Sequence, residues 1–177
     1  MDSYVFDTSA LICYIENEKG AEEVELLLVD ALEKNNSIHV SIVSLIEVFY
    51  ISLKEQGEKI ANERLELIKA LPFDISNIEM LNVKGIGNLK AHNKISFADS
   101  CIAALALETG GVLVHKDPEF EPIKSIKQMR LPYKKYLNCS NNYDSTSSNS
   151  SAFKPSPSER VGRGASFSIF RLSIMNF

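Results

Sequence analysis

Short apolar runs alternate with longer amphipathic segments over the first three quarters of the chain. The apolar runs are typical of buried strands and lie at 4–6, 38–43, 73–75, 112–115 and, less clearly, 125–131. Helical periodicity or helix-ending residues mark the segments 9–15, 21–32, 44–53, 58–70, 77–91 and 96–109. Strands separated by helices predict an α/β fold, with a central parallel sheet covered by helices on both faces.

The composition changes at Asn138, after which 138–151 is mostly Ser and Asn. Such a segment cannot bury enough apolar surface to offset the entropy of ordering. We therefore expect one domain at residues 1–137, followed at 138–177 by a disordered Ser/Asn-rich linker and C-terminal extension. Apolar residues return at 165–177 around Arg171 without a clear period, so a partner-binding segment is the alternative there.

The charge of the chain limits how it could hold a polynucleotide. The formal net charge is −4, and up to Leu137 the 21 acidic residues outnumber the 15 basic ones. A non-specific nucleic-acid coat requires a basic face. Any polynucleotide would therefore be held by local charge, a metal ion or a partner.

The expected compartment follows from the cysteines and from the apolar runs. Cys13, Cys101 and Cys139 are odd in number and lack metal-type spacing, which favours reduced thiols. The sequence shows no signal-peptide pattern and no apolar run long enough for a membrane span. We expect a cytoplasmic protein that does not bind membranes.

Four carboxylates stand where an apolar segment gives way to a helix or turn: Asp7, Glu47, Asp99 and Asp117. In an open α/β sheet the carboxyl ends of parallel strands form the edge at which ligands bind. Carboxylates gathered there would suit a hard divalent cation such as Mg²⁺ or Mn²⁺, whereas zinc prefers His or Cys.

Each acid also has a purely structural interpretation. Asp7 could cap a helix, 44–47 and 96–99 both match the capping-box pattern, and Asp117-Pro118 is a common helix start. The segment 97–107 is apolar nearly all round, which predicts a buried helix. Burying the Asp99 carboxylate there would cost free energy unless it is paired or bound to a metal ion. Capping alone would not require four such sites at one sheet edge. The two roles are compatible, because helix amino ends also stabilise negative charge.

Four sequence blocks, at 6–11 (FDTSAL), 44–48 (SLIEV), 96–103 (SFADSCIA) and 113–120 (LVHKDPEF), resemble the signature of PIN-domain nucleases. Within that family they are similar to the VapC-like ribonuclease toxins of type II toxin–antitoxin systems. Any one block is weak, but their order and spacing from Tyr4 to about Tyr133 are specific. The segment 138–177 matches nothing in this pattern.

The resemblance implies a three-layer α/β/α sandwich around a parallel sheet, Mg²⁺ or Mn²⁺ as cofactor, and cleavage of RNA. It places the four family acids on Asp7, Glu47, Asp99 and Asp117. It also implies a small antitoxin partner and a homodimer. On this hypothesis Asp7 and Asp99 are the core metal ligands and Asp117 completes the set, while Glu47 binds through water or orients the attacking water.

Two further residues are candidates for substrate binding. Ser9 could bond a metal-bound water or the substrate phosphate, and Lys116 could contact an RNA phosphate. A helix-start serine and a surface lysine are the structural alternatives. His39, His92 and His115 lack ligand spacing and are not assigned to the site.

Two other functions stay open from the sequence. The same fold could be a nucleic-acid binding or scaffold module with little catalysis, although the intact set of four acids argues against it. Another α/β phosphotransfer fold, a receiver or a haloacid-dehalogenase-like phosphatase, is the third possibility. A dehalogenase-type loop would require a second aspartate two residues after Asp7, and that position is Ser9.

Overall fold

The structure is a computed structural model that describes residues 2–132. The predicted linker and extension at 138–177, and Cys139 within it, lie outside the described residues. The described strands are β1 (Asp2–Phe6), β2 (Asn36–Ser41), β3 (Phe73–Ser76), β4 (Val112–His115) and β5 (Lys127–Arg130). The α-helices are α1 (Thr8–Ile15), α2 (Ala21–Leu32), α3 (Ile42–Gln56), α4 (Glu58–Ala70), α5 (Val83–His92) and α6 (Phe97–Thr109), with 3-10 turns η1 (Met80–Asn82) and η2 (Pro118–Phe120).

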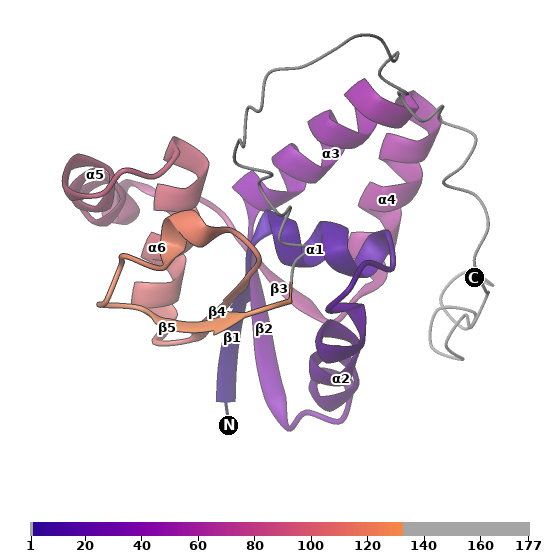
Figure 1. Ribbon diagram of the computed structural model, residues 1–177, viewed down its shortest axis with the longest axis horizontal. Helices are drawn as coiled ribbons and strands as arrows, with labels where there is room; N and C mark the ends of the chain where they lie inside the picture. The colour runs from indigo at the N-terminus through magenta and orange to yellow at the C-terminus, as the bar shows by residue number, and fades with distance from the viewer. Residues whose placement is uncertain (1, 133–177) are drawn as a thin grey trace, which may run out of the picture. The chain divides into compact units, whose positions relative to one another are not determined.

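The strands form one parallel sheet in the order β3-β2-β1-β4-β5. Figure 1 shows α5 and α6 on one side of this sheet and α1 and α2 on the other. Helices α3 and α4 form a hairpin that extends past the carboxyl end of β2. The predicted three-layer α/β/α sandwich around a parallel sheet is confirmed.

Burial along β1 shows that both faces of the sheet are covered. Val5 and Phe6 are neighbours in a strand, so their side chains point to opposite faces, yet both are fully buried. Val5 packs in one core layer with Ile102 of α6. Phe6 lies on the opposite face, where its ring meets that of Phe73 edge to face at 5.7 Å. Such two-sided burial explains why the strand is a continuous apolar run.

The order of the strands locates the ligand-binding edge. From β1 the chain moves outward to β2 and β3, and it then returns to place β4 on the other side of β1. The connections that leave β1 and β4 therefore run in opposite directions, which defines a switch point between these two strands. Asp7 directly follows β1, and Asp117 comes two residues after β4.

Two helix boundaries differ from the prediction. Helix α3 begins at Ile42 because the hydroxyl of Ser41 caps it, accepting from the backbone N of Val43 at 3.2 Å. The predicted capping box at 44–47 is therefore wrong, and Glu47 lies in the second turn of α3. Helix α5 begins only at Val83, after η1, and continues through both of its glycines.

Helix α6 is not buried all round, which corrects the prediction made from its apolar sequence. Phe97 is 62% exposed and Leu107 is 44% exposed, whereas Ile102 is fully buried. Asp99 itself is half-buried. None of the helices within residues 2–132 has both the length and the apolar character that a membrane crossing requires.

Candidate active site

A pocket of about 330 Å³, here called the acidic pocket, brings together all four predicted acids. Asp7 reaches it from the end of β1, Glu47 from α3, Asp99 from the first turn of α6, and Asp117 from the end of β4. Because α6 runs antiparallel to the strands, its amino end lies at the carboxyl edge of the sheet. The complete lining is Asp7, Thr8, Ser9, Ile12, Glu47, Ile51, Ser96, Asp99, Asp117 and Glu119.

Asp7 is the most buried of these acids, with only 4% of its surface exposed. It caps α1: its Oδ2 accepts a hydrogen bond from the backbone N of Ser9 at 3.0 Å and another from the Ser9 hydroxyl. Burial raises the pKa of Asp7 to about 7; the charge of Asp99 adds to the rise, and the bonds from Ser9 oppose it. The ionised form is therefore costly at neutral pH, and a positive charge in the pocket would stabilise it.

Ser9 links Asp7 to the segment that follows β4, which is distant in sequence but adjacent in the fold. Its hydroxyl donates to Asp7 and accepts from the backbone N of Lys116 at 2.9 Å, across 107 residues of sequence. The backbone N of Asp7 also donates to the carbonyl of Val114 at 3.1 Å. Ser9 thus positions Asp7 against β4, and its hydroxyl proton is not available to a phosphate in this arrangement.

The Lys116 side chain does not line the acidic pocket. Its ammonium donates to Glu18 at 2.6 Å and to the carbonyl of Lys19 at 3.1 Å, and it lies 3.6 Å from the Cys13 sulfur. The side chain is only 13% exposed. The predicted contact with an RNA phosphate stays a prediction, and it would require Lys116 to leave this ion pair.

Glu47 is held by Thr8, which the sequence reasoning did not single out. The Thr8 hydroxyl donates to Glu47 Oε2 at 2.6 Å. Burial raises the pKa of Glu47, the charge of Asp99 raises it further, and the bond from Thr8 opposes both effects. The only local signal was a hydroxyl residue beside Asp7, and its partner lies 39 residues away.

The capping roles predicted for Asp99 and Asp117 are confirmed. Asp99 Oδ2 accepts from the backbone N of Ser96 at 3.0 Å, and the Ser96 hydroxyl accepts from the backbone N of Asp99 at 2.9 Å. Asp117 Oδ1 accepts from the backbone N of Glu119 at 2.8 Å, with proline at the first position of η2. Glu119 is a fifth acid at the pocket, and the sequence reasoning passed over it.

His115 supports the turn that carries Asp117. Its Nδ1 donates to the Asp117 carbonyl at 2.7 Å, and its ring meets that of Phe120 edge to face at 5.2 Å. Burial lowers the pKa of His115, so the neutral ring is favoured. The structural interpretation of this histidine fits its position better than a role as a ligand.

Each of the four predicted acids uses only one carboxylate oxygen in hydrogen bonds among the described residues. The oxygens in use are Asp7 Oδ2, Glu47 Oε2, Asp99 Oδ2 and Asp117 Oδ1. No Lys or Arg within residues 2–132 forms an ion pair with any of the four. These hydrogen bonds therefore leave a second oxygen of each carboxylate able to bind a cation.

The donor chemistry of the pocket fits a hard divalent cation, since every candidate ligand is an oxygen. In the described part of the chain, no three His, Cys, Asp or Glu side chains lie close enough together to form a complete ligand set. This does not conflict with Mg²⁺, which commonly keeps several waters and binds through one or two carboxylates. Asp99 is best placed to act with others, because its charge affects both Asp7 and Glu47.

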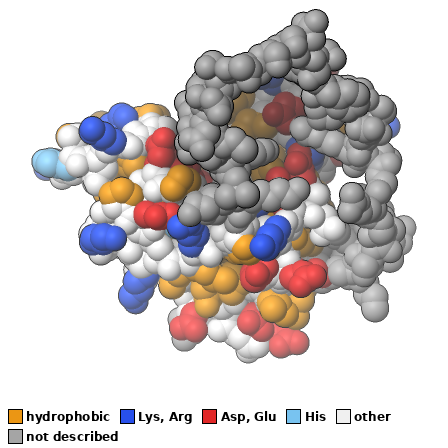
Figure 2. All heavy atoms as spheres, in the orientation of Figure 1, with side chains coloured by type: hydrophobic (Ala, Val, Ile, Leu, Met, Phe, Trp, Pro, Cys, Tyr) orange, Lys and Arg blue, Asp and Glu red, His pale blue; other side chains and the backbone are white. Residues whose placement is uncertain are grey.

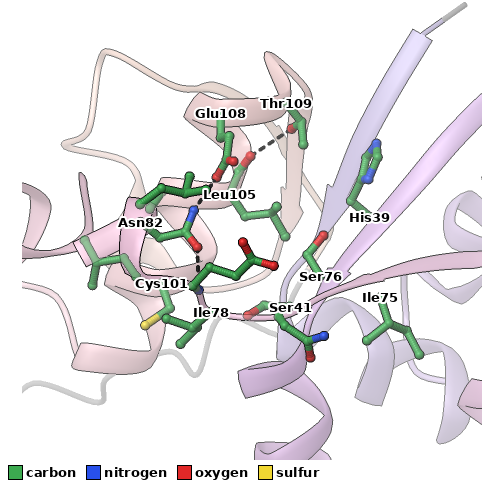
Figure 3. A pocket seen from close by; sticks show the side chains of 15 residues that line it. His39, Ser41, Ile75, Ser76, Ile78, Asn82, Cys101, Leu105, Glu108 and Thr109 are labelled. Atoms are coloured by element: carbon green, nitrogen blue, oxygen red, sulfur yellow. Dashed lines mark hydrogen bonds between the residues drawn. The ribbon is translucent and has the colours of Figure 1, made fainter. Parts of the chain in front are cut away.

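A second cavity of about 470 Å³ lies apart from these acids, between the ends of β2 and β3 and helix α6. Figure 3 shows Asn82 and Glu108 pointing toward each other, joined by a hydrogen bond of 2.8 Å, with Leu105 beside them. His39 and Cys101 also line this cavity. None of the four predicted acids does, so the cavity is separate from the acidic pocket.

The described part of the face seen in Figure 2 shows no large basic area. Lysine and arginine side chains are scattered there among acidic and apolar ones. This agrees with the net charge of the chain, which is −4. The acidic pocket would therefore need a cation to attract a phosphate.

Several solved structures contain a chain whose fold is similar to that of this chain. A DNA-bound VapBC2 complex from Rickettsia felis contains a chain that is 20% identical, with a TM-score of 0.61 over 73% of this chain and 99% of that chain. A DNA-bound VapBC from Salmonella typhimurium contains a chain that is 21% identical, with a TM-score of 0.60 over 73% of this chain and 98% of that chain. Mycobacterium tuberculosis VapC20, described as a sarcin-ricin loop cleaving toxin, is 12% identical, with a TM-score of 0.51 over 68% of this chain and 95% of that chain.

Sequence comparison identifies the family. No curated protein matches the chain. The sequence profile of the PIN domain matches residues 4–125, which include all four predicted acids. This is more than half of the chain, and the parallel sheet has the predicted layers. The chain belongs to the PIN domain family.

Proposed function

We propose that the protein is an Mg²⁺- or Mn²⁺-dependent endoribonuclease that hydrolyses RNA phosphodiester bonds in the cytoplasm, and that it is the toxin of a type II toxin–antitoxin system. The observation that carries this proposal is the acidic pocket. Four carboxylates from four elements converge there, and each keeps one oxygen free of hydrogen bonds within the described residues. Membership of the PIN domain family supports a nuclease.

Different residues of the acidic pocket would bind the cation and accept the proton of the attacking water. When bound, a divalent cation would polarise the phosphodiester and lower the pKa of an attacking water. Asp7 and Asp99 would hold this ion, with Asp117 completing the set. Glu47, whose pKa is raised by burial, would orient the attacking water and accept its proton through the oxygen that Thr8 leaves free.

Cleavage should depend strictly on the cation. We expect the purified chain to cut total RNA with Mg²⁺ or Mn²⁺ and to be inactive in EDTA, with excess Mg²⁺ restoring activity. The reason is that an uncompensated cluster of carboxylates repels the phosphate it must bind. Gel electrophoresis of the RNA over time measures the result, and cutting that persists in EDTA would exclude the metal-dependent mechanism.

One observation favours a second function, a PIN-fold nucleic-acid binding or scaffold module with little catalysis. The described residues contain no ready-made set of three metal ligands. If this alternative is correct, RNA will be retained in a gel-shift assay with Mg²⁺ and no products will form. The same samples therefore distinguish the two functions.

The partner is proposed from the neighbours in fold and from the charge of the pocket. The structures from Rickettsia felis and Salmonella typhimurium are described as DNA-bound VapBC2 and VapBC, and VapBC-5 from Mycobacterium tuberculosis is described as a member of the VapBC family of toxin–antitoxin systems. By analogy, we propose that this chain pairs as a homodimer and binds a small antitoxin. An arginine-bearing segment of such an inhibitor would suit the acidic pocket, although charge complementarity sets the encounter rate more than the affinity.

Expression of the chain alone should arrest growth, and co-expression of the neighbouring small gene should relieve the arrest. Asp99→Asn is the control, because it removes one carboxylate and should be harmless at equal expression. Growth curves and immunoblots measure both effects. Normal growth in cells that contain soluble protein active on RNA in vitro would contradict the toxin assignment.

A further inference from the structure

Helices α1 and α3 pack side by side and run in the same general direction. A line of contacts between them starts at the acidic pocket. Thr8 bonds Glu47 at the pocket, and Ile12 and Ile51 follow, since both line the same pocket. The line ends where Gln56 donates to Glu16 at 3.4 Å. The α1 positions are spaced by four residues, so they lie on one face of the helix. We call this contact the α1–α3 seam.

The far end of the seam is closed by Arg64 of α4. Its Nη2 donates to Glu16 Oε1 at 2.9 Å, and its Nη1 donates to the hydroxyl of Ser52 at 3.1 Å. Glu16 caps the end of α1, and Ser52 belongs to α3. Arg64 therefore connects α1, α3 and α4 through one guanidinium group.

Arg64 has an unusual environment for a basic residue in this chain. Its exposure is 9%, and it is the only buried Lys or Arg within residues 2–132. Ser52 is fully buried, and the Glu16 side chain is 30% exposed. A buried guanidinium is retained only when its donors are paired, so the three side chains hold one another in a fixed geometry.

We propose that Arg64 is a positioning residue for Glu47. The hairpin α3–α4 extends past the sheet, so the sheet alone does not fix the angle between α3 and α1 (Figure 1). Thr8 fixes the near end of the seam, and Arg64 fixes the far end. Loss of Arg64 frees α3 to move away from α1, which carries Glu47 away from Thr8 and from the other acids.

This inference rests on the proposed nuclease function only for its kinetic test. The variant is Arg64→Met, which keeps the length of the side chain and removes the donors. The matched control is Lys69→Met, because Lys69 lies on the same helix and pairs with Glu66 at 2.8 Å at the exposed surface. Circular dichroism and thermal melts first establish that both variants are folded at the assay temperature.

We expect Arg64→Met to lower the cleavage rate per folded molecule by about 10- to 100-fold, as loss of a supporting residue commonly does, with KM little changed. Lys69→Met should match the parent. Glu16→Gln, which keeps an acceptor and removes the charge, should give a smaller loss in the same direction. It also serves if Arg64→Met does not fold.

A double-mutant cycle with Thr8→Val separates positioning from general stabilisation. If both residues act by placing Glu47, the loss caused by Arg64→Met shrinks in the Thr8→Val background. If the two losses multiply in full, Arg64 does not act through Glu47 and the proposal is overturned. An unchanged rate in folded Arg64→Met overturns it as well.

Hydrogen exchange tests the seam without any activity. In EDTA, amides of α1 and α3 should exchange faster in Arg64→Met than in the parent or in Lys69→Met. Equal exchange in all three proteins would refute the seam. Should the parent fail to cleave RNA, the nuclease function fails, while the exchange measurement still decides the role of Arg64.

Discussion

An Asp99→Asn variant should fold normally and lose RNA cleavage by orders of magnitude. Asparagine retains a side-chain oxygen that can accept from the backbone N of Ser96, so the cap of α6 is preserved. The substitution removes the charge that acts on both Asp7 and Glu47, and with it an anionic metal ligand. A reaction that depends on a cation for transition-state charge loses most of its rate when a ligand is neutralised.

The matched control for this experiment is Glu108→Gln. Glu108 is an exposed acid on the same helix, and it lines the second cavity instead of the acidic pocket. Single-turnover cleavage of a defined RNA measures all three proteins. Parent-like cleavage by Asp99→Asn would show that Asp99 is only a helix cap, and an equal loss in Glu108→Gln would show that the loss is not specific to the acidic pocket.

An Asp7→Asn variant should be more stable than the parent in EDTA at neutral pH and equally stable at acidic pH. The pKa of Asp7 is raised from 3.8 to about 7 in the folded protein. Between these values the folded state binds more protons than the unfolded state, so the stability of the parent falls as pH rises. Each pKa unit corresponds to about 1.4 kcal/mol, which gives a cost on the order of 4 kcal/mol above pH 7.

Asparagine removes this cost and keeps an acceptor for Ser9 at the start of α1. The difference in melting temperature should thus be near zero at pH 4 and on the order of 10 °C at pH 8. The control is Asp30→Asn, an exposed acid of α2, which should follow the parent at every pH. Added Mg²⁺ should stabilise the parent more than Asp7→Asn, because binding to the native state favours the ionised carboxylate.

A lower melting temperature for Asp7→Asn at pH 8 in EDTA would contradict this account. It would mean that the negative charge of Asp7 contributes more to the cap of α1 than burial costs it. The pH series distinguishes the two accounts, because loss of a helix cap lowers the stability by about 1 kcal/mol at most pH values. Only a buried carboxylate gives a difference that grows between pH 4 and 7.

The strands and the acidic edge were predictable because their signals are local. Consecutive apolar residues such as Val5 and Phe6 indicate a strand buried on both faces, and helices between strands require parallel pairing. Parallel strands end at one edge, so Asp7 and Asp117 were expected to meet. The strand order, with β1 at the centre, is set by contacts between distant residues and was not predicted.

The start of α3 was misjudged because two serines have similar surroundings. Ser41 and Ser44 both follow β-branched residues, and only Ser44 is followed three positions later by glutamate. In the structure β2 pairs with β3 up to Ser41, and the helix begins at the next residue. The length of the paired strand decided the boundary, and sequence periodicity does not report that length.

The four acids of the site were predicted from the sequence, whereas the hydrogen bonds that support them were not. The sequence of α6 is apolar nearly all round, so it could not show which face meets the sheet or how far Asp99 is exposed. The bond from Thr8 to Glu47 and the bond from Lys116 to Ser9 join distant parts of the chain. Such pairs leave no periodic signal, and only the fold reveals them.

The central place of β1 sets the order of events during synthesis on the ribosome. One edge of β1 pairs with β2 soon after that strand is made, but the other edge waits for β4, whose Val112 pairs with Tyr4. Until then β1 has an open edge, and Asp117, which follows β4, has not joined Asp7. Closing a contact of this sequence separation is slow. A nascent or prematurely terminated chain that lacks β4 therefore has no assembled pocket, and the open edge of β1 makes it prone to aggregate.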